Sequence, residues 1–127
     1  MLTEVKNKTA DLVSNAIIDR LKLLATKVKT LTYDNGKEFA HHASNDQALG
    51  STSYFADPYS SWQRGSNENL NGLIRQYIPK ARPLSTVSDA ELAKIECLLN
   101  SRPRKRLGYK TPLEVFVKSI KPVALRA

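Results

Sequence analysis

The feature that most constrains the fold is an alternation of helical and strand patterns in the first half of the chain. Apolar residues recur at the helical period over residues 9–27, and β-branched and aromatic residues then alternate over 28–33. A weaker helical pattern over 38–49, closed by a glycine, precedes a short strand pattern over 52–55. This order predicts an α/β fold with a short, mostly parallel sheet flanked by helices. The first helix should bury a stripe that contains Leu12, Val13, Ala16, Ile17, Leu21 and Leu24.

Three further helices are predicted in the second half. A stripe of Leu70, Leu73, Ile74 and Tyr77 predicts a helix over 66–78. Two capping boxes, SDAE from residue 88 and TPLE from residue 111, predict the starts of the other two. In the helix that starts at residue 88, Leu98 belongs to the apolar stripe and Cys97 lies beside it, so we expect both side chains to pack in the core. The opening segment MLTEV is a candidate strand.

Composition limits the class of protein. A chain of 127 residues fits a single domain, with a basic helical part from about residue 80. No apolar run is long enough to cross a membrane and no secretory leader is recognisable, so we expect a cytoplasmic protein without a membrane partner. One cysteine excludes an internal disulfide and a multi-cysteine zinc site.

The net charge of +8 is unevenly distributed. Lysine and arginine balance the acidic residues up to Ile74, so the whole surplus falls from Arg75 onward. A basic half is typical of a protein that binds a polyanion such as nucleic acid. The alternative is a basic surface that serves solubility or ribosome association.

Asp34 follows a predicted strand and precedes Asn35-Gly36. Asn-Gly is also the favoured centre of a two-residue hairpin turn, but the following residues do not alternate as a returning strand would. In open parallel sheets, ligands and catalytic groups gather at the carboxyl ends of the strands. Asp34 is therefore a candidate metal ligand.

Glu68 lies in the first turn of the predicted helix over 66–78, on the face opposite the apolar stripe. A solvated carboxylate favoured by the helix dipole explains this position without any function. The neighbouring Asn67, Asn71, Gly72 and Arg75 favour close approach of a phosphodiester backbone instead. Two carboxylates on separate elements are what Mg²⁺ or Mn²⁺ requires, with water and phosphate oxygens as further ligands.

Three other features have a structural interpretation beside a functional one. His41 and His42 are adjacent, point in different directions on a helix and are interpreted as surface residues. Tyr59 and Trp62 can stack on a base or seal their loop against the helix, and sealing is the preferred interpretation. The basic loop RPRKR is either a solvated loop or a phosphate-binding segment.

Three segments together carry a family resemblance: TLTYDNGKEF, YFADPYSSWQRGSNENLNGLIRQYIPK and NSRPRKRLGYKTPLEVF. They resemble, in order, the integrase-core region of bacterial insertion-sequence transposases of the branch numbered thirty. The gap between Asp34 and Glu68, residues 35 to 67, has the 33 residues typical of the last two members of the acidic triad in these enzymes. Ser61 stands where a proline is usual.

The resemblance implies a truncated ribonuclease H-like fold, DNA as the partner, and Mg²⁺-dependent or Mn²⁺-dependent phosphoryl transfer that cleaves and joins DNA strands. Asp34 and Glu68 would be the second and third catalytic carboxylates and the metal ligands. The residues implied to contact DNA are Arg64, Asn67, Asn71, Arg75, Arg102, Arg104, Lys105 and Arg106.

One departure limits that expectation. The first catalytic aspartate of the family lies on the first strand, and no residue of this chain matches it. We therefore expect little catalysis from the chain alone, and weak or incomplete metal binding. The sheet edge left without its neighbouring strands predicts a homo-oligomer. The alternative function is a non-catalytic DNA-binding or oligomerising fragment that regulates or poisons the intact enzyme.

Overall fold

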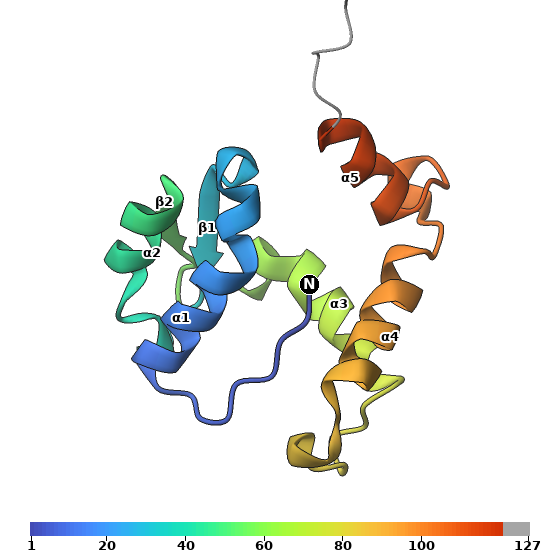
Figure 1. The fold of residues 1–127 in the computed structure, drawn as a ribbon, viewed down its shortest axis with the longest axis horizontal. Coiled ribbons are helices and arrows are strands. Elements are labelled where there is room, and N and C mark those ends of the chain that lie inside the picture. The colour runs from blue at the N-terminus through green and yellow to red at the C-terminus, as the bar shows by residue number, and fades with distance from the viewer. Residues whose placement is uncertain (121–127) are drawn as a thin grey trace, which may run out of the picture. The chain divides into compact units, whose positions relative to one another are not determined.

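The computed structural model describes residues 1–120, which form two compact units (Figure 1). The first, essentially Thr3–Thr86, contains α1 (Ala10–Leu21), β1 (Thr30–Tyr33), α2 (His42–Leu49), β2 (Thr52–Phe55) and α3 (Gly65–Arg75). The second, from Val87 onward, contains α4 (Asp89–Asn100) and α5 (Pro112–Ile120). The α/β architecture predicted from the alternating patterns is confirmed.

The sheet of the first unit consists of β1 and β2, which pair in parallel with Thr30 opposite Thr52 and Tyr33 opposite Phe55. A parallel pair requires a crossover, and the chain supplies it with a short turn over Lys37–Phe39 followed by α2. Helix α1 packs against α2, and α2 contacts β2. Gly50 ends α2 with a φ of 65°, a left-handed conformation in which glycine has no side chain to strain.

A buried polar chain joins three elements of the first unit. The Ser14 hydroxyl on α1 donates to Asn45 Oδ1 on α2 at 2.6 Å. The Asn45 amide in turn donates to the Tyr33 hydroxyl on β1 at 3.1 Å. Asn45 is only 1% exposed, so these bonds satisfy an amide that would otherwise be costly to bury. These two hydrogen bonds hold Tyr33 at the end of β1, next to Asp34.

Helix α3 is shorter than the predicted 66–78. It ends at Arg75, and residues 76–78 continue as hydrogen-bonded turns in which Ile78 N donates to Ile74 O at 2.9 Å. Ile78 is buried, and Leu70 and Tyr77 are half-buried, which agrees with the predicted stripe. Glu68 is exposed, on the opposite face as expected.

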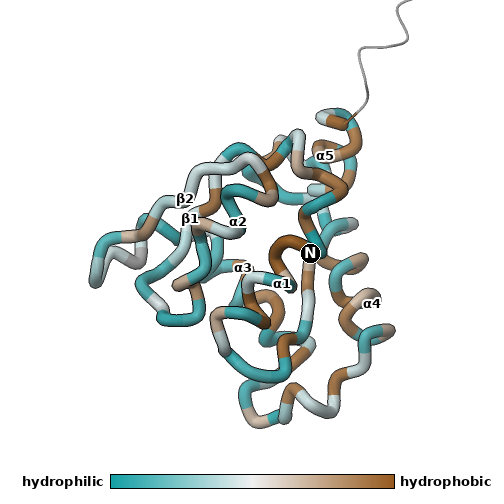
Figure 2. Tube along the Cα trace, turned by 60° about the vertical axis from the view of Figure 1, so that its left-hand side comes forward, coloured by the Kyte–Doolittle hydropathy of each residue, from teal (hydrophilic) through white to brown (hydrophobic). Residues whose placement is uncertain are grey.

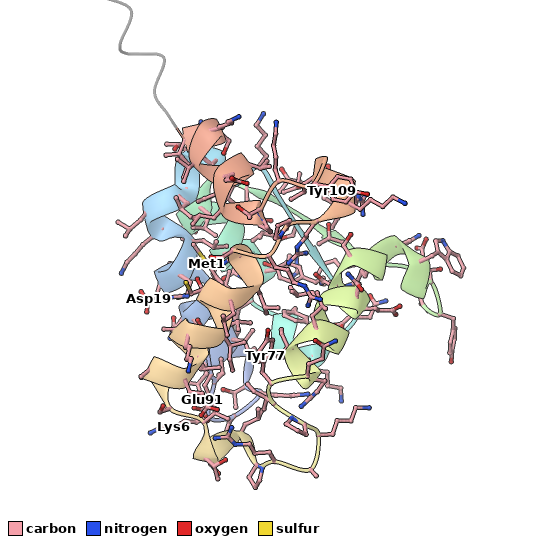
Figure 3. All side chains as sticks on the ribbon, turned by 90° about the vertical axis from the view of Figure 1, so that its right-hand side faces the viewer. Met1, Lys6, Asp19, Tyr77, Glu91 and Tyr109 are labelled. Carbon is pink, nitrogen blue, oxygen red and sulfur yellow. The ribbon has the colours of Figure 1, made fainter. Side chains whose placement is uncertain are left out.

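Both predicted capping boxes in the second unit form. Ser88 Oγ accepts from Glu91 N at 3.2 Å at the start of α4. At α5, Thr111 Oγ1 accepts from Glu114 N at 3.1 Å, and Glu114 Oε2 accepts from Thr111 N at 2.7 Å. Hydrophobic and hydrophilic residues intersperse along both helices (Figure 2). Tyr109 lies on the loop that joins them (Figure 3).

Several expectations are wrong. Residues 1–5 form no strand in the described chain, because the segment has no neighbouring strand to complete a ladder with it. Leu12 is exposed, and so are Leu98 and Cys97, because the buried side of α4 is centred on Ile95 and Leu99. Within residues 1–120, no helix has the length and apolar character needed to cross a membrane.

Candidate active site

Asp34 leaves the carboxyl end of β1 directly after Tyr33, which is buried. Its Oδ1 accepts a hydrogen bond from Gly36 N at 3.2 Å, which shapes the tight turn. The chain then enters the crossover rather than a returning strand, because β2 runs parallel to β1. The hairpin interpretation of Asn35-Gly36 is therefore wrong, and the Asp34 side chain, 52% exposed, projects from the end of a rigid strand.

The carboxyl ends of the two strands are tied together. Ala56 N donates to Tyr33 O at 2.8 Å, and the Asn35 side-chain amide donates to Ala56 O at 2.9 Å. Asn35 therefore does more than turn the chain: it links the segment after β1 to the segment after β2. These bonds fix the position of Asp34 relative to the loop that leads to α3.

Asp34 and Glu68 line one cavity of about 450 Å³. Three of the residues predicted to contact DNA line it too: Arg64, Asn67 and Asn71. Asn67 and Asn71 are four residues apart on α3 and share a face, while Glu68 lies at the edge of that face. The structure thus brings together two predicted carboxylates and three predicted polar partners from a strand end and a helix.

Arg64 is an ion-pair partner of Asp34. Its Nη1 lies 2.8 Å from Asp34 Oδ2, and 26% of the arginine side chain is exposed. Arg64 Nε is buried and, within the described residues, has no hydrogen-bond partner. The pair with Asp34 therefore leaves one buried donor of the guanidinium without a partner.

A loop over residues 57–62, here the rim loop, completes the cavity. Asp57, Pro58, Tyr59 and Ser60 line the cavity, and none of them was predicted as a site residue. Asp57 and Gln63 close the loop reciprocally: Asp57 N donates to Gln63 Oε1 at 2.9 Å, and Gln63 Nε2 donates to Asp57 Oδ2 at 2.9 Å. The signal available in the sequence was that Asp57 follows β2 as Asp34 follows β1.

The aromatic residues of this region do not seal the loop. Tyr59 is fully exposed and Trp62 is 75% exposed, so the preferred interpretation of these two residues is wrong. His41 is on the surface as expected, with Nε2 3.2 Å from Asp11 Oδ1. His42 is half-buried instead, with its ring edge toward Phe55 at a centroid distance of 4.9 Å.

The donor set suits one hard divalent cation. Carboxylate and amide oxygens are the ligands that Mg²⁺ and Mn²⁺ prefer, and the cavity offers them from Asp34, Glu68 and Asn67. No group of three or more histidine, cysteine or acidic side chains in the described residues is placed to hold a metal. Asp34, Glu68 and Asn67 are therefore the side chains that could hold an ion here, and Arg64 is a competing cation beside Asp34.

The remaining predicted DNA contacts lie elsewhere. Arg75 lines a second cavity of about 530 Å³ together with Asn71, Gly72 and Lys80. The four cations of the RPRKR loop belong to the second unit. Three of them are exposed, while Arg104 is half-buried and its Nη2 donates to Leu99 O near the end of α4 at 3.5 Å. Arg104 therefore supports the loop as well as adding charge.

Comparisons with known proteins find that the chain is similar to transposases of bacterial insertion sequences. No family model matches it. It is 48% identical over 91% of its length to the transposase for insertion sequence element IS4351 of Bacteroides fragilis. It is 44% identical over 91% to the transposase for IS1086 of Cupriavidus metallidurans, and 40% identical over 94% to transposase InsI for IS30A of Escherichia coli. The resemblance found in the sequence is confirmed: these proteins are homologues of the chain.

The chain spans about a third of the length of these relatives, between 32% and 35%. The similarity extends over the segments that contain Asp34, Glu68 and the rim loop, because it covers more than nine tenths of the chain. The activity of these longer relatives is therefore a basis for a proposal about this chain.

Proposed function

We propose that this homologue of insertion-sequence transposases is the part of a DDE-type catalytic core that carries the second and third carboxylates of the site. The observation that carries the proposal is the convergence of Asp34 and Glu68 on one cavity from a strand end and from a helix. The parallel order of β1 and β2, with the acid at the strand end, is the arrangement expected of a truncated ribonuclease H-like fold.

Each residue of the cavity has a role in this proposal. Asp34 and Glu68 hold a divalent cation, Mg²⁺ or Mn²⁺, which when bound supplies Lewis-acid activation of a phosphodiester. Asn67 and Asn71 donate hydrogen bonds to the DNA backbone from one face of α3. Arg64 pairs with Asp34 when no cation is bound, and a cation on Asp34 would release Arg64 Nη1 to donate to a phosphate.

The basic residues outside the cavity hold the DNA. Arg75 extends the polar face of α3 beyond Asn71, and the RPRKR loop adds sequence-independent phosphate contacts from the second unit. The chain itself is expected to bind DNA and to catalyse little, because no residue supplies the first carboxylate of the triad.

A chimera tests the catalytic assignment. The chain replaces the corresponding third of the Escherichia coli transposase InsI, and Mn²⁺-dependent nicking of a plasmid carrying the transposon ends is measured. The account expects Asp34→Asn and Glu68→Gln each to abolish nicking. Asp19→Asn, which changes an exposed acid of α1 that pairs with Lys22, is the matched control and should nick normally. Normal nicking by both site variants would refute the assignment of Asp34 and Glu68 as catalytic carboxylates.

A second function is favoured by the separation of the cavity from the basic loop into different units. A fragment that binds DNA through the loop and pairs through an exposed sheet edge would regulate the intact enzyme without catalysis. Inhibition of full-length transposase by added chain, unchanged by Glu68→Gln, would support this alternative. Light scattering that shows a monomer at high concentration would remove the pairing part.

A further inference from the structure

Two large aromatic side chains stand in water beside the candidate active site. Tyr59 is fully exposed and Trp62 is 75% exposed, although aromatic rings usually gain most from burial. Both come from the short segment that joins β2 to α3, and Tyr59 lines the same cavity as Asp34 and Glu68. Tyr59 therefore lies next to the place where a scissile phosphate would bind, and Trp62 follows it three residues later on the same segment.

The rim loop holds Tyr59 in an unfavourable backbone conformation. Its φ is 59°, in the left-handed region that bulky residues avoid. The reciprocal Asp57–Gln63 pair closes the loop around it, and Ser60 N donates to Asp57 O at 3.2 Å. Here hydrogen bonds within the loop hold a strained tyrosine exposed to solvent. Such strain is typical of a ligand-binding site rather than of a residue that packs in the core.

We propose that Tyr59 and Trp62 form a stacking platform for unpaired DNA bases next to the phosphate bound at Asp34 and Glu68. The inference rests on the proposed function and deepens it by specifying the form of DNA. Inside a duplex, every base face is covered by its neighbours, so a protein ring can stack only on an unpaired or displaced base. The platform would hold the frayed or already cleaved strand in register with the carboxylates.

A protein partner is the other occupant to consider, and the composition of the rim loop disfavours it. Residues 57–62 contain no leucine, isoleucine, valine or methionine, and Tyr59 is flanked by Pro58 and Ser60. The fully buried core of a protein interface is more apolar than its polar rim. Isolated aromatic rings among polar groups, beside the cationic Arg64, match a surface that binds single-stranded nucleic acid.

The experiment uses the chain itself and three fluorescently labelled oligonucleotides. The first is a blunt duplex, the second the same duplex with an unpaired 3′ tail, and the third carries an abasic tail. Fluorescence anisotropy gives the affinities at several salt concentrations. Trp62 is the one tryptophan of the sequence, so intrinsic emission reports on it directly. Circular dichroism verifies that each variant folds. Substitutions of exposed side chains should leave the fold unchanged.

The expected result is tighter binding of the tailed duplex than of either other DNA, with quenching of Trp62 emission by the tail bases. Tyr59→Ala and Trp62→Ala should each weaken binding of the tailed duplex by about five- to a hundredfold and leave blunt-duplex binding nearly unchanged. Tyr59→Phe keeps the ring and should bind like the parent chain. Tyr54→Ala removes another exposed tyrosine, one that does not line the cavity, and should have no effect.

Four results would overturn the inference. Equal affinity for the tailed and abasic-tailed duplexes, or unchanged affinity of both alanine variants, would remove the platform while leaving salt-dependent duplex binding, and so the proposed function, intact. Emission that changes with protein concentration and not with DNA would assign the rings to a second copy of the chain. Absence of salt-dependent binding to any of the three DNAs would overturn the proposed function as well.

Discussion

Arg64→Gln should raise the affinity of the chain for a divalent cation, because it removes a positive charge that already occupies Asp34. The guanidinium Nη1 lies 2.8 Å from Asp34 Oδ2 in a pair that is partly solvated, with the arginine 26% and the aspartate 52% exposed. Pairs of this exposure contribute about 0.2–1 kcal/mol. Losing the competitor should therefore tighten Mn²⁺ binding by up to about fivefold.

Titration of the chain with Mn²⁺, with free ion followed by electron paramagnetic resonance, measures this change. Arg64→Lys is the matched control, since it keeps the charge near Asp34 and should leave the affinity close to that of the parent. The same Arg64→Gln variant should bind DNA more weakly, because the proposed phosphate donor is lost. An affinity for Mn²⁺ that falls or stays constant in Arg64→Gln would refute the competition between the two cations.

Three further predictions concern the scaffold and the basic loop. Asn45→Ala should lower the free energy of unfolding by about 1–3 kcal/mol, measured by urea denaturation, because Ser14 and Tyr33 lose their buried partner; Gln47→Ala, on the exposed side of α2, should cost little. Desolvation raises the pKa of Asp46, but hydrogen bonds from Ser51 and Ser53 outweigh it and lower the pKa below its ordinary value. The Asp46 carboxylate therefore stabilises the fold at pH values above the pKa that Asp46 has in the unfolded chain. The difference in free energy of unfolding between the parent and Asp46→Asn should be largest at pH 7 and should disappear as the pH falls below about 4. Replacing Lys105 and Arg106 together by glutamine should reduce the slope of log affinity for DNA against log salt by about 0.9 per lost phosphate contact, and unchanged slopes would remove the loop from the interface.

Local patterns predicted the elements well because each signal is contained within a few residues. The boxes at Ser88 and Thr111 start helices where expected, and Gly50 ends α2 in the left-handed conformation that its chemistry favours. The convergence of Asp34 and Glu68 followed from the motifs and from the strand-end rule, and they line a common cavity in the structure.

Contacts between distant side chains could not be predicted in the same way. Arg64 was expected to contact DNA, and its pairing with Asp34, 30 residues away, depends on how the rim loop carries α3 back to the strand end. Asn45 lies on a helix with a weak apolar pattern, and the helical period of apolar residues therefore does not predict its burial. The hydroxyls of Ser14 and Tyr33, which satisfy its amide, come from distant parts of the sequence. The sequence favours Tyr59 and Trp62 sealing their loop against the helix over stacking on a base, and only the fold shows that both side chains are exposed within the described chain.

The central claim, that Asp34 and Glu68 act on one cation, is tested most directly by a double-mutant cycle on Mn²⁺ binding to the chain. The account predicts that Asp34→Asn and Glu68→Gln each weaken binding, and that the double variant loses much less binding free energy than the sum of the two single losses. Independent, additive losses, or binding that neither substitution changes, would contradict the claim that the two carboxylates share a ligand.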